Sequence, residues 1–119
     1  MEISIFDKMA LAQFTSVEKQ SMYQLLCGAM VVDGNRDSRE IALINEINQI
    51  MNFTVAEQQA SRSLSGETMV SILRGMDDFK KIFVARFMAQ VLLADGMVTQ
   101  KEEQFFMYMK DLLQLPDVD

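Results

Sequence analysis

The chain has 119 residues, of which 50% are hydrophobic and 24% are charged, and its formal net charge is −6. This length and composition predict one globular domain over residues 1–119 that buries about two-thirds of its unfolded surface, while the negative charge argues against nucleic acid as a partner. The chain has no histidine, which excludes Ser-His and Cys-His nucleophile pairs, histidine acid–base catalysis and most zinc sites.

The pattern of cysteines and apolar residues predicts a soluble, cytoplasmic protein. Cys27 is the only cysteine, so no internal disulfide can form, and we expect it to be a small buried hydrophobe. The N-terminus has an early acid and no basic segment before a long apolar run, which is not the pattern of a signal peptide. Uncharged stretches are well short of the ~20 residues that span a bilayer.

Apolar residues recur at three- and four-residue spacings along almost the whole chain, which predicts an all-α protein. In chain order, the expected helices cover residues 4–12, 17–32, 38–51, 55–63, 66–74, 78–94 and 100–113. Capping boxes support several of the starts, because a small polar residue and an acid three residues later can each bond the other's backbone N–H. The pairs are Thr15 with Glu18, Asp37 with Glu40, Thr54 with Glu57, and Thr99 with Glu102.

A shift of 62 residues aligns two parts of the chain, which predicts an internal repeat with units at about 16–53 and 78–115. In each unit a long apolar helix reaches an Asp-Gly pair, at Asp33 or Asp95, and a capping-box Glu then opens an amphipathic helix. Glycine ends the first helix because it adopts the left-handed conformation at little cost. We expect a single compact bundle of about seven helices, with the two units packed pseudo-symmetrically around one core.

The Asp-Gly pairs also suggest a comparison with EF-hand calcium loops, which have Gly at position 6 and a bidentate Glu at position 12. Glu40 and Glu102 each stand six residues after such a glycine. Positions 1 and 3, which need oxygen ligands, are Ala29 and Val31 in the first unit and are also apolar in the second. The sequence therefore argues against an EF-hand.

The run at residues 29–34 followed by Glu40, and the run at residues 93–96 followed by Glu102, resemble the TerB-like family, whose namesake is a tellurite-resistance protein. The resemblance covers roughly residues 20–115. It implies an all-helical fold with internal pseudo-symmetry, a link to tellurite and other stress responses, metal binding through acidic residues, and a role in membrane-associated or multi-protein assemblies.

The resemblance also implies a set of candidate metal ligands, namely Asp33, Glu40, Asp95 and Glu102. Asp37 has less support, because the second unit has Thr99 at the equivalent position. An all-oxygen set favours Ca²⁺, Mg²⁺ or Mn²⁺ over zinc. The same acids also have a purely structural explanation as helix caps and turn residues, so both explanations stay open.

Two functions of different classes follow from these residues. The first is a non-enzymatic TerB-like interaction or stress-response module that has protein partners, associates with membranes only through such a partner, and binds a divalent cation at its acidic turns. The alternative is a metal-dependent hydrolase that uses the carboxylates of the two Asp-Gly turns. We favour the first, because adjacent acids such as Glu102 and Glu103 point about 100° apart on a helix and form no acid–base dyad.

Three further groups of side chains have a structural and a functional interpretation. The 11 methionines are expected mainly in the core, with an adaptable methionine-rich groove as the rival. The stripe of Phe79, Phe83 and Phe87 is expected in the core. Lys80 and Lys81, with nearby Arg86, are expected on a solvated face rather than in an anion site.

Overall fold

The computed structural model describes residues 5–31, 38–93 and 98–116. Within these residues, helices form where the apolar pattern of the sequence predicts them. In chain order these are α1 (Ile5–Leu11), α2 (Ser16–Met30), α3 (Ser38–Ile50), α4 (Val55–Ser61), α5 (Gly66–Arg74), α6 (Asp78–Leu93) and α7 (Gln100–Leu113). Their ends lie within two residues of the expected ranges, and the described residues contain no strand. The all-α prediction is confirmed.

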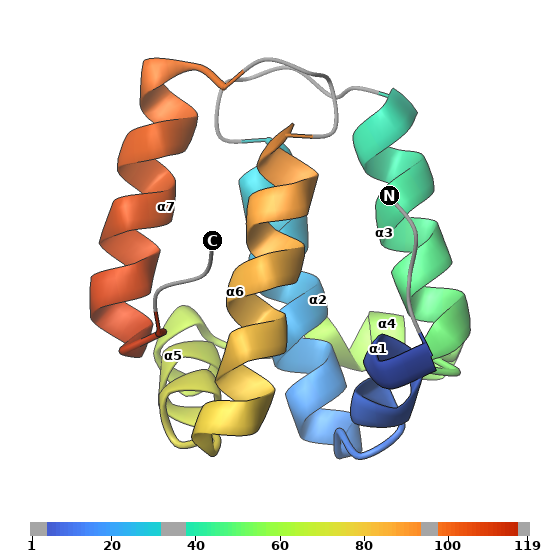
Figure 1. Ribbon diagram of the computed structural model, residues 1–119. Coiled ribbons are helices and arrows are strands. Elements are labelled where there is room, and N and C mark those ends of the chain that lie inside the picture. Colours follow the sequence, from blue (N-terminus) through green and yellow to red (C-terminus); the bar gives the residue numbers. More distant parts are fainter. Residues whose placement is uncertain (1–4, 32–37, 94–97, 117–119) are drawn as a thin grey trace.

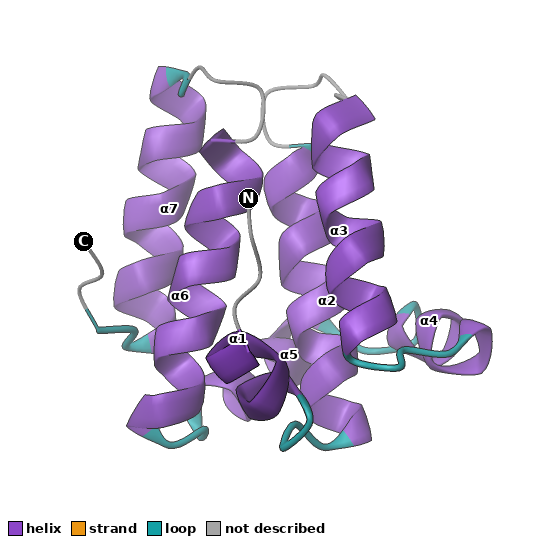
Figure 2. Cartoon of the chain, turned by 45° about the vertical axis from the view of Figure 1, so that its right-hand side comes forward, coloured by secondary structure: helices purple, strands orange, loops and turns teal. Residues whose placement is uncertain are grey.

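The four long helices run alongside one another, with α2 and α6 in the middle and α3 and α7 on opposite flanks (Figures 1 and 2). The last turns of α2 and α6 and the first turns of α3 and α7 lie at the same end of the molecule, and the short helices α1, α4 and α5 lie at the other. Helix α2 packs against α3, α4, α5, α6 and α7. The radius of gyration, 13.1 Å, is that of a compact chain of this length.

The core forms mainly around α2 and α6, because these helices are apolar around most of their circumference and are covered from several sides. Leu26 of α2 and Phe87, Met88 and Val91 of α6 are completely buried. Most methionines belong to this core, as expected: Met22, Met51, Met69, Met76, Met88 and Met109 are all buried. None of the described helices is long and apolar enough to cross a bilayer.

The expectation for the phenylalanine stripe is wrong at Phe79, which is 52% exposed, whereas Phe83 and Phe87 are buried. Residues spaced by four advance about 40° around a helix with 3.6 residues per turn, so the two ends of this stripe diverge by about 80°. Phe79 therefore turns out of the core and forms a T-shaped ring pair with Phe83, with 5.3 Å between the ring centroids.

The expectation that the basic group around Lys80 and Lys81 lies on a solvated face is also wrong. Lys81 is only 6% exposed, and the Lys80 side chain is 17% exposed and forms an ion pair. Lys80 follows the exposed start of α6, and its Nζ reaches Glu18 of α2. Lys80 crosses to α2 there, which spacing along the sequence alone does not indicate.

Candidate functional site

Capping boxes begin α2, α4 and α7 as predicted. In the box of α7, the Thr99 backbone N–H donates to Glu102 Oε1 at 3.0 Å, and Thr99 Oγ1 accepts from the Glu102 backbone N–H at 3.1 Å. The boxes of α2 and α4 have the same reciprocal pair of bonds. In the fourth predicted box, Asp37 lies outside the described residues.

The predicted metal ligands divide into two groups. Glu40 and Glu102 lie in the first turns of α3 and α7 and are almost fully buried, with exposed fractions of 2% and 1%. Asp33, Asp37 and Asp95 lie outside the described residues. Within residues 5–31, 38–93 and 98–116, no group of three or more Cys, Asp or Glu side chains is arranged to hold a metal ion. The metal prediction therefore depends on aspartates beyond these ranges and stays a prediction.

Glu102 also lines a pocket between α6 and α7, which is a feature that sequence reasoning missed. The pocket has a volume of about 250 Å³, and its walls include Leu92, Leu93, Val98 and Phe106. The neighbouring residue Glu103 lines it as well. The only signal in the sequence was the capping pattern, which accounts for one oxygen of Glu102 and says nothing of the cavity beside it.

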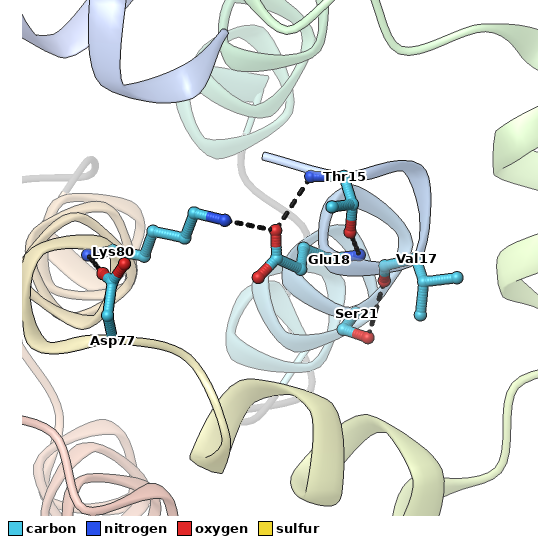
Figure 3. Close-up of polar contacts among 6 residues, drawn as sticks. All are labelled: Thr15, Val17, Glu18, Ser21, Asp77 and Lys80. Atoms are coloured by element: carbon cyan, nitrogen blue, oxygen red, sulfur yellow. Dashed lines mark hydrogen bonds and ion pairs between the residues drawn. The ribbon is translucent and has the colours of Figure 1, made fainter. Parts of the chain in front are cut away.

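A second feature missed in the sequence is an ion pair between the two central helices. Lys80 Nζ of α6 lies 2.7 Å from Glu18 Oε1 of α2, the same oxygen that accepts the Thr15 backbone N–H at 2.8 Å (Figure 3). Lys80 Nζ also lies 5.7 Å from the centre of the Phe14 ring, a cation–π distance. The Lys80 backbone N–H donates to Asp77 Oδ1 at 2.8 Å, which holds the first turn of α6.

The electrostatic environment of Glu18 favours its charged form. Partial burial acts to raise the pKa of this carboxyl, but the hydrogen bond and charge of Lys80 and the hydrogen bonds from Thr15 outweigh burial. The pKa of Glu18 is consequently lowered from its ordinary value. The pair can thus link α2 and α6 electrostatically at neutral pH.

An open groove of about 740 Å³ lies between α5 and α7. Its walls are mainly apolar and include Gly66, Met69, Val70, Met109 and Leu112, and Arg74 also lines it. Tyr108, which is 65% exposed, stands one helical turn before Leu112 on α7. Two of the methionines considered for an adaptable groove, Met69 and Met109, do line one.

Comparisons with known proteins address the fold but not the activity. No protein-family model matches the chain, and no curated protein matches its sequence. Among solved structures, a protein of unknown function from Porphyromonas gingivalis W83 aligns with a TM-score of 0.76 and 21% identity, over 88% of this chain and 83% of that one. At this identity the likeness shows a shared fold alone. The resemblance to the TerB-like family stays a prediction from sequence.

Proposed function

We propose that this chain is a non-enzymatic TerB-like interaction module that binds an amphipathic helix of a partner protein in the groove between α5 and α7. The observation that carries this proposal is the groove itself. Its volume of about 740 Å³ falls within the range of about 300–1,000 Å³ typical of ligand pockets, so it has room for several side chains.

The composition of the groove supports a helix as its occupant. Met69 and Met109 supply flexible, polarizable side chains that adjust to different apolar surfaces. Gly66 has open space where a Cβ would stand, so the backbone of α5 is accessible there. The exposed Tyr108, one helical turn before Leu112, belongs to the residue class enriched at binding hot spots. An amphipathic helix would bury its apolar face between these walls.

Site-specific photo-crosslinking in the cells that produce the protein tests this proposal. Benzoylphenylalanine in place of Val70 is expected to capture one or a few defined proteins, because Val70 lines the groove. The matched control carries the same group in place of Glu46, which is exposed on α3. Each captured protein is then purified and its binding measured against wild-type and Val70→Asp chains. Equal capture from both positions, or binding that Val70→Asp leaves unchanged, would contradict the proposal.

We further propose that the module binds a divalent cation through Asp33, Glu40, Asp95 and Glu102. The four helix ends that flank the two Asp-Gly pairs in the chain all lie at one end of the molecule (Figure 1), which supports this proposal. Glu40 and Glu102 lie in the first turns of α3 and α7, at this same end.

A thermal-shift titration with Ca²⁺, Mg²⁺ and Mn²⁺ tests the cation. An ion at one hundred times its Kd adds about 2.7 kcal/mol to the free energy of unfolding, which raises Tm by roughly 8 °C or more in a domain of this size. The double variant Asp33→Ala with Asp95→Ala should lose the shift, and the control Asp111→Ala should keep it. If none of the three ions raises Tm, the proposal of a cation site is wrong.

We also propose that residues 16–53 and 78–115 form two units of an internal repeat. Glu18 and Lys80 are 62 residues apart, which is the shift that aligns the two units. Equivalent residues touch each other only near the axis of a twofold arrangement, and the 2.7 Å contact between these side chains supports an axis between α2 and α6.

A further inference from the structure

The groove between α5 and α7 follows the length of α5. Its lining on that helix extends from Glu67 in the first turn to Arg74 in the last turn. Helix α7 contributes Met109 and Leu112, which stand one turn apart. A helix bound in the groove therefore lies along α5 and touches α7 over about one turn.

Opposite charges stand at the two ends of this lining. Glu67 and Arg74 are seven residues apart, which places them about 10 Å apart along the axis of α5 and within about 20° around its circumference. Both residues are exposed, and neither forms an ion pair among the described residues. Val70 lines the groove between them. The α5 wall is thus negative near its start, apolar in the middle and positive near its end.

This order of charges defines the helix that complements it. An acid on the bound helix would face Arg74, and a base seven residues away on the same face would reach Glu67. Apolar residues three and four positions from the acid would lie over Val70. Arginine also pairs with carboxylates through two parallel hydrogen bonds, which adds geometric specificity at that end.

Helix macrodipoles indicate the direction in which such a helix binds. Acids are favoured in the first turn of a helix and bases in the last turn, and α5 itself has this distribution. A partner helix with the same distribution brings its acidic N-terminal part to Arg74 and its basic C-terminal part to Glu67. Its direction is then antiparallel to α5, which also places the opposite ends of the two dipoles together.

We propose that the groove binds a partner helix antiparallel to α5, with an acid of its N-terminal part paired to Arg74 and a base seven residues later paired to Glu67. This inference rests on the proposed function, because it assigns charges and a direction to the helix that occupies the groove.

The first test is an NMR titration of the full ¹⁵N-labelled chain at low ionic strength with two blocked, alanine-rich peptides of about 20 residues, a length that forms helix in water. The charged peptide has a glutamate, leucines three and four residues later, and a lysine seven residues after the glutamate. The neutral peptide has glutamine in place of the glutamate and the lysine. The charged peptide should shift the Val70 amide and bind roughly tenfold more tightly, at about threefold for each ion pair. The variant Glu67→Gln with Arg74→Gln should bind both peptides equally.

A nitroxide label on the N-terminus of the charged peptide tests the direction. In the wild-type chain the label should broaden the amide of Gly75 more than that of Gly66, because these glycines line opposite ends of the groove. In the double variant Glu67→Arg with Arg74→Glu the order should reverse. Both substituted residues are exposed, so we expect this variant to fold.

A matched control makes the same exchange of charges away from the groove. Glu46→Lys with Lys101→Glu changes exposed residues of α3 and α7 that do not line the groove. This variant should bind the charged peptide with the affinity and the direction of the wild type.

The possible failures separate this inference from the proposed function. If both peptides shift the Val70 amide with equal affinity, or the charge exchange leaves the label where it was, the inference is wrong and the proposed function stands. If neither peptide shifts the Val70 amide, the groove is no helix site, and both are contradicted. Broadening of that amide as the chain alone is concentrated would identify a second copy of the chain as the occupant, which would overturn the partner helix.

Discussion

The ion pair between Lys80 and Glu18 should make a measurable contribution to the stability of the fold. The two groups are 2.7 Å apart, and their side chains are only 17% and 15% exposed. A hydrogen bond to a charged group contributes about 1.5–3 kcal/mol, whereas exposed ion pairs contribute about 0–1 kcal/mol. Partial burial places this pair between those cases, so we expect a coupling energy of about 1–2 kcal/mol.

A double-mutant cycle isolates that energy from the other contacts of the two residues. Glu18→Gln keeps an acceptor for the Thr15 cap, and Lys80→Met keeps an apolar stem over Phe14. The free energy of unfolding is measured by urea denaturation at pH 7 for the wild type, both single variants and the double variant. Lys101→Met, at an exposed position of α7, replaces Lys80→Met in a control cycle and should show no coupling to Glu18→Gln.

The pH dependence of the coupling provides an independent test. Because the folded-state pKa of Glu18 lies below its ordinary value of 4.5, its stabilising contribution is present above about pH 4.5 and is lost as the pH falls through the folded-state pKa. The coupling energy should therefore shrink toward zero in acid. A coupling below about 0.3 kcal/mol at pH 7, which is within the error of additivity, would refute the argument.

Three other substitutions test separate parts of the structure, all by urea denaturation or thermal unfolding. Glu102→Ala should lower the free energy of unfolding by about 1–2 kcal/mol through loss of the α7 cap, and Glu102→Gln by less than half of that; equal losses would show that the cap is not the cause. Gly28→Ala should raise the free energy of unfolding by about 0.5–1 kcal/mol, because Gly28 lies within α2, where alanine is favoured over glycine. The added Cβ would meet Phe105 of α7 at an ordinary van der Waals distance of 4.0 Å. A fall in Tm would mean that α7 has to shift to make room for the Cβ. Leu26→Ala should cost about 2–5 kcal/mol, since Leu26 is completely buried, and a loss under 1 kcal/mol would contradict its central place in the core.

The helices could be predicted closely because their signals are local. A capping box such as Thr99 with Glu102 satisfies backbone groups within one turn, and it forms wherever that turn becomes helical. Apolar periodicity likewise indicates that a segment buries one face. It does not determine how wide that face is, which is why Phe79 was expected in the core and is instead half exposed.

The candidate site was harder to predict, because its parts come together only through packing. The groove combines residues of α5 and α7, and the pocket combines residues of α6 and α7. Glu102 was predicted as a helix cap and a metal ligand, and the cap is present. Its position beside an apolar cavity depends on the approach of Leu92 from α6, which no pattern within α7 indicates.

The sequence by itself determined where the helices begin and end, because periodicity and capping act over three or four residues. Only the tertiary structure decided which side chains meet across helices. Lys80 was expected in water and lies against Glu18 because α2 and α6 pack side by side at that point. Contacts of this kind depend on the angle and register between helices, which arise from the whole core at once.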